Sequence, residues 1–190
     1  MNPTHLFWQI KQDYRIQQVE SEWIEFIKLI STMNLEWVME IGAYSCGSAA
    51  TFGHFSKNVI SIDSKLTAFG KNKMPLVKKL CNYTYIVKDS HLPECMDLVN
   101  NALGNNLLDI LFIDGDHTYD GAKKDFYAYK HLVKPGGMIV LHDIVTSKYH
   151  NSLGCKVFKL WEEIKDDYIS QEINGGLNWG GIGIIHTVCP

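Results

Sequence analysis

Residues 108–144 read LDILFIDGDHTYDGAKKDFYAYKHLVKPGGMIVLHDI, and this stretch contains the pattern from which the fold can be inferred. An apolar run over 107–113, interrupted by a single aspartate, is typical of a central parallel strand that is covered on both faces. A helix is expected over 121–133, and the KPGG sequence at 134–137 predicts a stop and a turn. A further strand is expected over 138–141. This order predicts two parallel strands joined by a right-handed crossover.

Strand-like and helix-like segments continue to alternate on both sides of this unit. Helix-breaking Pro75 lies inside one predicted helix and is expected to interrupt it. At the carboxyl end, Gly175 and Gly176 separate two β-rich segments, which predicts an antiparallel hairpin at one edge of a mostly parallel sheet with helices on both faces. The predicted strands cover 37–41, 58–63, 83–87, 168–173 and 182–188, and the predicted helices cover 48–55, 66–81, 92–103 and 155–166.

The amino-terminal part of the chain has a purely helical pattern. Over 16–33, apolar side chains recur at spacings of three and four, which indicates one helix face. We therefore divide the chain into an N-terminal helical extension (1–35) and an α/β domain (36–190). Phe7 and Trp8 are candidate contacts in a homo-oligomer.

Bulk properties exclude several classes of function. The chain has 190 residues and a net charge of −3, without the basic stripe that a nucleic-acid-binding protein usually shows. No apolar run has the length of a membrane span, and the first residues lack a signal-peptide pattern, so we expect a cytoplasmic protein. The five cysteines are scattered and form no CxxC pair, which argues against a zinc site.

Small residues follow the first predicted strand, where residues 40–48 read EIGAYSCGS. Gly42 and Gly47 would let the backbone turn tightly and approach a ligand closely. The next helix would offer free N–H groups to an anion. A plain strand-to-helix turn is the alternative, and the missing GxGxxG spacing argues against a dinucleotide site.

Acidic residues end the next two strands. Asp63 could accept hydrogen bonds from both hydroxyls of a ribose, or, with Ser64, it could cap a helix. Asp89, followed by Ser90, could accept a hydrogen bond from an adenine amino group, and a helix cap is again the alternative.

Ionisable residues are densest after the fourth and fifth strands. Asp114, Asp116 and His117 follow the fourth strand, and His142 and Asp143 follow the fifth. Parallel neighbours would bring these residues together, and such a set could hold Mg²⁺ or another divalent cation. Either histidine could instead act as a general base. The third interpretation is that these groups only hold the loops together by hydrogen bonds.

The stretch 108–144 resembles class I methyltransferases, in particular the branch with cephalosporin hydroxylase-like and macrolide-sugar O-methyltransferases. The segments EIGAYSCGSA (40–49) and GCKVFKLWEEIK (154–165) are similar to the same branch, and the first also resembles catechol O-methyltransferase. The resemblance covers about 37–186. It implies a Rossmann-like class I methyltransferase fold with a seven-stranded sheet.

The resemblance also implies S-adenosylmethionine (SAM) as cofactor. In metal-dependent members, the ligands match Asp114, His142 and Asp143, although the position of His142 is commonly acidic there. His117 matches a histidine that could deprotonate the acceptor, and His142 and Asp143 complete the candidate catalytic set. The implied cofactor-binding residues are Glu40, Gly42, Ala43, Tyr44, Gly47 and Ser48 for the methionine end and its turn, Asp63 and Ser64 for the ribose, Asp89 and Ser90 for the adenine, and Asp114 and Asp116.

These observations predict SAM-dependent methyl transfer to a hydroxyl of a small molecule or sugar, with or without a divalent cation. Two alternatives stay open, an NAD-dependent oxidoreductase and a non-catalytic nucleoside-binding module. The loop 145–153 and Trp179 are expected to border the acceptor pocket, where Tyr149 and Trp179 could stack on a ring or simply pack as a lid.

Overall fold

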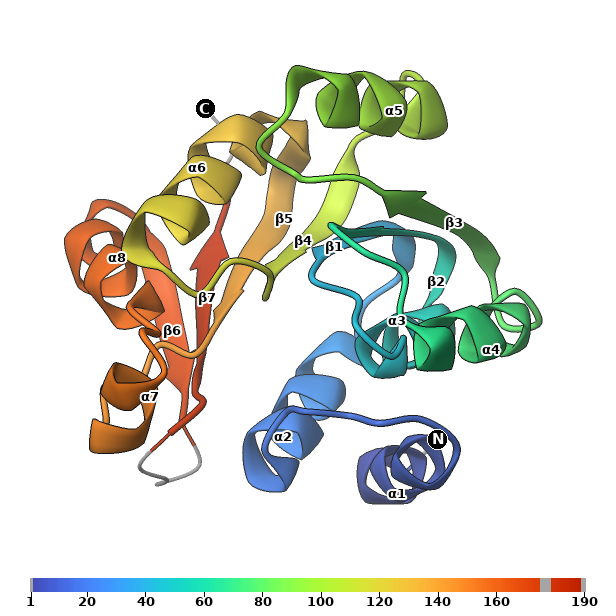
Figure 1. Cartoon of the computed structure of the whole chain (residues 1–190), viewed down its shortest axis with the longest axis horizontal. Coiled ribbons are helices and arrows are strands. Elements are labelled where there is room, and N and C mark those ends of the chain that lie inside the picture. Colours follow the sequence, from blue (N-terminus) through green and yellow to red (C-terminus); the bar gives the residue numbers. More distant parts are fainter. Residues whose placement is uncertain (1, 175–178, 189–190) are drawn as a thin grey trace.

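The computed structural model describes residues 2–174 and 179–188, so Gly175 and Gly176 of the predicted hairpin lie outside the described residues. One seven-stranded sheet has the order β3-β2-β1-β4-β5-β7-β6 (Figure 1). β1 to β5 pair in parallel, and β7 is antiparallel to both β5 and β6, which confirms the predicted sheet. The strands are β1 (Leu35–Ile41), β2 (Ser56–Asp63), β3 (Asn82–Val87), β4 (Leu108–Ile113), β5 (Val133–His142), β6 (Ile169–Ile173) and β7 (Ile182–His186).

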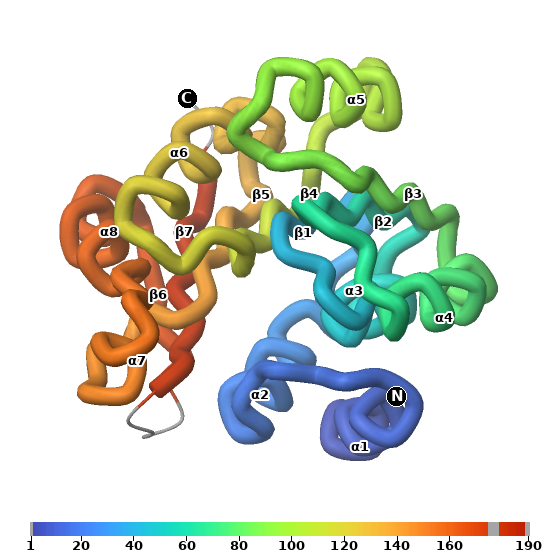
Figure 2. Tube along the Cα trace, viewed as in Figure 1, coloured from blue at the N-terminus to red at the C-terminus, as the bar shows by residue number. Residues whose placement is uncertain are grey.

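Helices cover both faces of the sheet, as Figures 1 and 2 show. One face carries α1 (Pro3–Asp13), α2 (Glu20–Ile30), α3 (Gly47–Gly53) and α4 (Ala68–Val77), and the other carries α5 (Pro93–Leu103), α6 (Tyr119–Tyr129) and α8 (Val157–Ile164). The short helix α7 (Lys148–Ser152) follows β5, and two 3-10 turns occur at Lys130–Leu132 and Lys165–Asp167. No helix within the described ranges is both long and apolar enough to span a bilayer.

The two faces of the sheet bury separate hydrophobic clusters. Along β1, Val38 points into the cluster beneath α1–α4, whereas Met39 points into the cluster beneath α5, α6 and α8. In the first cluster, the Trp23 ring of α2 lies 5.5 Å from the Phe112 ring of β4. Burial of one such ring contributes roughly 2–3 kcal/mol, so the N-terminal helices are part of the core.

The N-terminal helix prediction needs one correction. Residues 16–19 are not helical, and α2 begins only at Glu20. A long-range contact holds this segment outside the helix, because the Gln18 side chain donates to Asp114, and the Val19 N–H, which donates to Glu22, marks the start of α2. Hydrophobic periodicity alone did not reveal this break.

Three local predictions also differ from the structure. Pro75 lies within α4 and does not end it. The KPGG turn is part of β5, where pairing with β4 lapses after Val133 and resumes at Met138. Gly136 there has a φ of +79° and donates its N–H to the Thr187 carbonyl at 2.7 Å, so this part of β5 pairs with the residue that follows β7. The predicted loop 145–153 contains α7.

The sheet reverses its strand order between β1 and β4. From β1 the chain proceeds outward to β2 and β3, and it then returns to β4 and proceeds outward to β5 on the other side. Ligands of open α/β sheets bind in the crevice at such a point, at the carboxyl ends of the strands.

Candidate active site

A cleft of about 820 Å³ lies at the carboxyl ends of the five parallel strands. Its walls come from the residues directly after each strand, from the segment between α1 and α2, and from α7 with Trp179. Every candidate site residue from the sequence lines this cleft except Glu40: Gly42, Ala43, Tyr44, Gly47, Ser48, Asp63, Ser64, Asp89, Ser90, Asp114, Asp116, His117, His142 and Asp143.

The turn after β1 has an unusual backbone. Gly42 has a φ of +100°, and a Cβ there would overlap the backbone carbonyl of Asp114. Tyr44 and Cys46 also have positive φ values, 40° and 64°. Left-handed non-glycine residues cost free energy and persist where the surroundings hold them. The turn is therefore fixed tightly against β4, with its backbone exposed to the cleft.

Glu40 lies beneath the cleft and not in its wall. Its side chain is fully buried, and its carboxylate accepts hydrogen bonds from the hydroxyls of Ser48 and Ser61, the latter at 2.5 Å. Burial raises the pKa of Glu40 to about 7. The resemblance implied a direct cofactor contact, whereas this position suits an indirect role through Ser48, which does line the cleft.

Asp63 joins the end of β2 to the turn after β1. One carboxylate oxygen accepts the Tyr44 N–H at 2.8 Å, and the other accepts the Lys65 N–H at 3.1 Å. Thr67 caps α4 by accepting the Gly70 N–H, so the helix-cap role considered for Asp63 falls to another residue. Each carboxylate oxygen can accept a further hydrogen bond from a ligand.

The tip of β3 is tied to α6. The Ser90 hydroxyl donates to Asp125 at 2.7 Å, and burial raises the pKa of Asp125 to about 6. The second oxygen of Asp125 is buried without a hydrogen-bond partner among the described residues. The Ser90 hydroxyl donates its only proton to Asp125, so this hydroxyl can only accept a hydrogen bond from a ligand. Asp89 caps no helix and accepts the His91 N–H at 2.9 Å.

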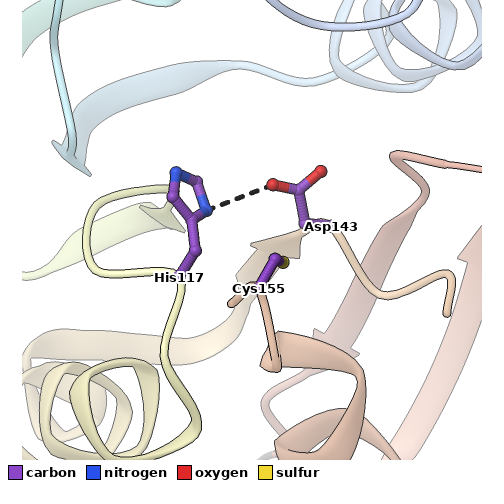
Figure 3. A group of neighbouring side chains, drawn as sticks. All are labelled: His117, Asp143 and Cys155. Atoms are coloured by element: carbon purple, nitrogen blue, oxygen red, sulfur yellow. Dashed lines mark ion pairs between the residues drawn. The ribbon is translucent and has the colours of Figure 1, made fainter. Parts of the chain in front are cut away.

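His117 and Asp143 form a pair at the opposite end of the cleft (Figure 3). Nδ1 of His117 lies 3.1 Å from Oδ2 of Asp143, and the other ring nitrogen points away from the carboxylate. The hydrogen bond to Asp143 raises the pKa of His117. Burial alone would raise the pKa of Asp143, but hydrogen bonds from His117 and His142 outweigh it and hold that pKa far below its usual range. The neighbouring Cys155 stays a thiol, because burial raises its pKa.

His142 is buried between carboxylates on both sides of its ring. Nε2 lies 2.8 Å from Glu22 of α2, and Nδ1 lies 3.1 Å from Asp114 and 3.4 Å from Asp143. Burial alone would lower the pKa of His142, but these carboxylates outweigh it and raise that pKa well above the usual value. Both ring nitrogens are therefore engaged.

Three residues of this network were not among the sequence candidates. Gln18 donates to Asp114 at 2.7 Å, Glu22 contacts His142, and Nε2 of His150 lies 3.3 Å from Asp143. His150 falls in the loop that the sequence analysis assigned to the acceptor pocket. Nothing in the local sequence marks Gln18 or Glu22, because their partners are about a hundred residues away.

Asp114, His142 and Asp143 are poorly suited to hold Mg²⁺. Single donor atoms of Asp114, His142 and Asp143 lie within 4.8 Å of one another, as a metal site requires. However, every carboxylate oxygen of Asp114 and Asp143 already faces an N–H donor or an imidazole nitrogen. Mg²⁺ also prefers oxygen ligands and retains its waters, so an imidazole nitrogen is an unsuitable ligand.

Comparison with protein families identifies one matching family model, described as a methyltransferase domain, over residues 39–144. An uncharacterized protein of Acanthamoeba polyphaga mimivirus is 34% identical over 112 residues, which cover 55% of this chain and 50% of the viral protein. The match therefore spans about half the length of that relative.

Solved methyltransferases share the fold at low sequence identity. The O-methyltransferase from Bacillus cereus in complex with SAH superimposes with a TM-score of 0.65 at 13% identity, covering 96% of this chain and 91% of that one. TomG from Streptomyces achromogenes, involved in tomaymycin synthesis and solved with SAM, gives 0.64 at 14% identity, covering 100% and 91%. MycE of the mycinamycin pathway, solved with Mg, SAH and mycinamycin VI, gives 0.68 at 14% identity, covering 99% and 55%.

Proposed function

Because this chain belongs to the methyltransferase family whose model matches residues 39–144, and has the Rossmann-like fold of class I methyltransferases, we propose that it transfers a methyl group from SAM to a hydroxyl of a small molecule or sugar. One observation carries the proposal. The same cleft contains a close-approach backbone turn with Asp63 at one end and the His117–Asp143 pair at the other.

The cleft suits SAM in shape and charge. Gly42 lacks the Cβ that would collide with the Asp114 carbonyl, so the turn after β1 packs against β4 and lines the cleft. Asp63 would accept hydrogen bonds from the ribose, and Asp89 would accept one from the adenine amino group. Asp114 and Asp143 give the far end a negative potential, which favours a ligand with a positively charged sulfur.

His117 is the proposed general base. When bound, SAM supplies an electrophilic methyl group on a sulfonium. The free ring nitrogen of His117 would take the proton from the acceptor hydroxyl, while the acceptor oxygen forms its bond to the methyl carbon and the carbon–sulfur bond breaks. Asp143 would hold the His117 ring in one tautomer and stabilise the imidazolium that forms. Alignment of the two reactants within the cleft supplies much of the remaining acceleration.

An exposed apolar rim supports a ring-containing acceptor. Tyr149, Leu153 and Trp179 line the cleft and are 60%, 65% and 40% exposed. The rings of Tyr149 and Trp179 meet edge to face at 6.3 Å. A sugar or another ring with one apolar face would cover this surface and place a hydroxyl near His117.

Calorimetric titration with SAM, SAH and NAD tests the cofactor class. We expect micromolar affinity for SAM and SAH and no binding of NAD, because residues 40–48 lack the dinucleotide spacing. Binding of NAD alone would favour an oxidoreductase. If SAM and SAH both fail to bind, the proposal is wrong.

Transfer of labelled methyl from SAM to a panel of hydroxylated ring compounds tests the reaction itself. Turnover that falls by about 10²–10⁴-fold in His117→Ala, with SAH affinity intact, is the expected result. Tight SAM binding without turnover on any acceptor would favour a non-catalytic nucleoside-binding module.

A further inference from the structure

His142 is the only one of the three histidines around Asp143 that has a carboxylate at each ring nitrogen among the described residues. Its ring lies between Glu22 on one side and Asp114 with Asp143 on the other. Glu22 is fully buried, so bulk solvent does not reach its carboxylate. It also accepts the backbone N–H groups of Val19 and Gly181, so its position does not depend on His142.

The hydrogen-bond chemistry of this cluster determines which atoms carry protons. An ionised carboxylate can only accept hydrogen bonds, and an imidazole nitrogen donates only when it is protonated. With Glu22 and Asp114 both ionised, a His142 ring that bonds Glu22 through Nε2 and Asp114 through Nδ1 carries a proton on both nitrogens. A ring in that state is a fixed cation with no lone pair for a metal.

We propose that the doubly protonated ring of His142 occupies the position of a divalent cation between Asp114 and Asp143, so that the proposed methyl transfer needs no metal. This inference rests on the proposed function. The ring supplies one positive charge between two carboxylates and holds Asp143 in place for His117. Glu22 is then a positioning residue, which acts on the cleft through His142.

The contacts of Asp114 and Asp143 agree with this arrangement. Both oxygens of Asp114 are engaged, one by His142 and one by the Gln18 amide. One oxygen of Asp143 faces His142 and the other faces His117, whereas Nε2 of His150, also nearby, accepts the Gly180 N–H and donates nothing to Asp143. No oxygen of these two carboxylates is among the buried atoms that lack a partner in the described chain.

A metal such as Mn²⁺ or Zn²⁺ offers the competing arrangement. Such ions accept imidazole ligands, and a metal-binding histidine usually donates its other N–H to a carboxylate, as Nε2 could to Glu22. The two arrangements differ in the state of one nitrogen of His142. Nδ1 of His142 carries a proton in our proposal, whereas in a metal site it must be deprotonated and bind the ion.

Nitrogen NMR of the wild-type protein tests this difference directly. With ¹⁵N-labelled histidine, and with His142→Gln to assign the signal, we expect both ring nitrogens of His142 to be protonated at neutral pH. Addition of Mg²⁺ or Zn²⁺ should leave the signal unchanged. An unprotonated Nδ1, or a shift on adding either ion at stoichiometric concentration, would overturn the proposal.

Metal titration of a matched pair of variants provides the second test. His142→Asp removes the fixed cation and adds a third carboxylate between Asp114 and Asp143. We expect it to bind Mn²⁺ at least ten-fold more tightly than the wild type, measured by the loss of the free Mn²⁺ signal in electron paramagnetic resonance. The exposed His131→Asp is the control, with the same substitution away from the cleft and no expected gain.

In His142→Asp the new carboxylate would face the buried carboxylate of Glu22, which could prevent folding. The double variant Glu22→Gln/His142→Asp removes this repulsion and repeats the measurement. Wild-type binding of Mn²⁺ as tight as that of the variants would contradict the proposal. SAH affinity with and without a chelator is measured in parallel and should agree within about two-fold. Failure of SAH to bind at all would sink the proposed function, whereas the NMR and metal results still decide the state of His142.

Discussion

The two ends of the cleft are built by different means. The cofactor end is shaped by backbone: Gly42 and Tyr44 have positive φ, and Asp63 accepts backbone N–H groups. The acceptor end is shaped mainly by side chains: His142 contacts Glu22, 120 residues away, and Asp143, which also has a positive φ of 64°, contacts His117. Changes at the first end should therefore alter binding and folding, and changes at the second should alter turnover.

The largest effect is expected from His117→Ala, which removes the proposed base. General-base catalysis typically contributes about 10²–10⁴-fold, so kcat should fall by that factor. SAH affinity should change less than about three-fold, because His117 lies at the acceptor end. Steady-state kinetics and calorimetry separate the two parameters, and an equal loss of both would contradict the division of the cleft.

Asp143→Asn refines the same prediction through pH. The Asp143 hydrogen bond is the first cause of the raised pKa of His117, and a base works only when it is deprotonated. Wild-type activity should thus rise with pH through a value above 6.5, the ordinary value for histidine. In Asp143→Asn this acidic limb should move to lower pH while the maximum kcat falls. A limb that does not move would remove His117 from the role of base.

Gly42→Ala is expected to have the next largest effect. Its Cβ would overlap the Asp114 carbonyl at a φ that alanine disfavours, so we expect a loss of about 3 kcal/mol in the free energy of unfolding. SAH binding should be lost with it. Gly104→Ala is the control, since Gly104 also has a positive φ but has open space around its Cβ position, and it should cost about 1–2 kcal/mol. Urea unfolding measures both losses. Equal losses would show that backbone strain alone, and not the overlap with Asp114, causes the loss of stability.

This contrast also explains how much the sequence predicted. The strand and helix order of β1 to β5 follows from local patterns, and so do the turn after β1 and the residues at each strand tip. A carboxylate directly after a parallel strand must face the crevice, which is why Asp63 and Asp114 were found. The family resemblance added the cofactor, which residue types alone left open.

The remaining features depend on contacts that no local pattern contains. The break at 16–19 and the roles of Gln18 and Glu22 arise because this segment crosses to β4 and β5. Glu40 was predicted to line the cleft because it lies near the end of β1, but the position along a strand does not show to which face of the sheet the side chain points. Its side chain points into the α3 face of the sheet, where serine hydroxyls take both oxygens.

Asp63→Asn tests the cofactor end more gently than Gly42→Ala. The asparagine keeps one acceptor for the turn but loses the charge and one acceptor site for a ribose. We expect SAH affinity to fall by about 10–100-fold, in the range of one or two hydrogen bonds to a charged group. The free energy of unfolding should change by less than about 1 kcal/mol. Asp89→Asn is the matched control, with a smaller expected loss, and unchanged affinity in a folded Asp63→Asn protein would remove the ribose assignment.

The smallest effect is expected at Glu40, which lies beneath the cleft. Burial raises its pKa from 4.5 to about 7, so the folded chain holds this proton more tightly than the unfolded chain does. Stability linked to Glu40 is therefore lost as pH rises from about 4.5 to about 7, and the deficit remains above that. Glu40→Gln removes the ionisable group while its amide can still pair with Ser48 and Ser61. We expect the variant to be more stable than the wild type by about 2 kcal/mol at pH 8 and to show little gain at pH 5.

Chemical denaturation at the two pH values measures this difference, with Glu36→Gln as the control. Glu36 lies on the same strand, but its side chain is half-exposed and pairs with Lys57, so its removal should change stability by about 0–1 kcal/mol at either pH. SAH affinity in Glu40→Gln should stay within about three-fold of the wild type, because Glu40 reaches the cleft only through Ser48. A variant that is less stable at pH 8 would show that the ionised carboxylate is needed by the two serines. A large loss of affinity would instead make Glu40 part of the backbone-built end of the cleft.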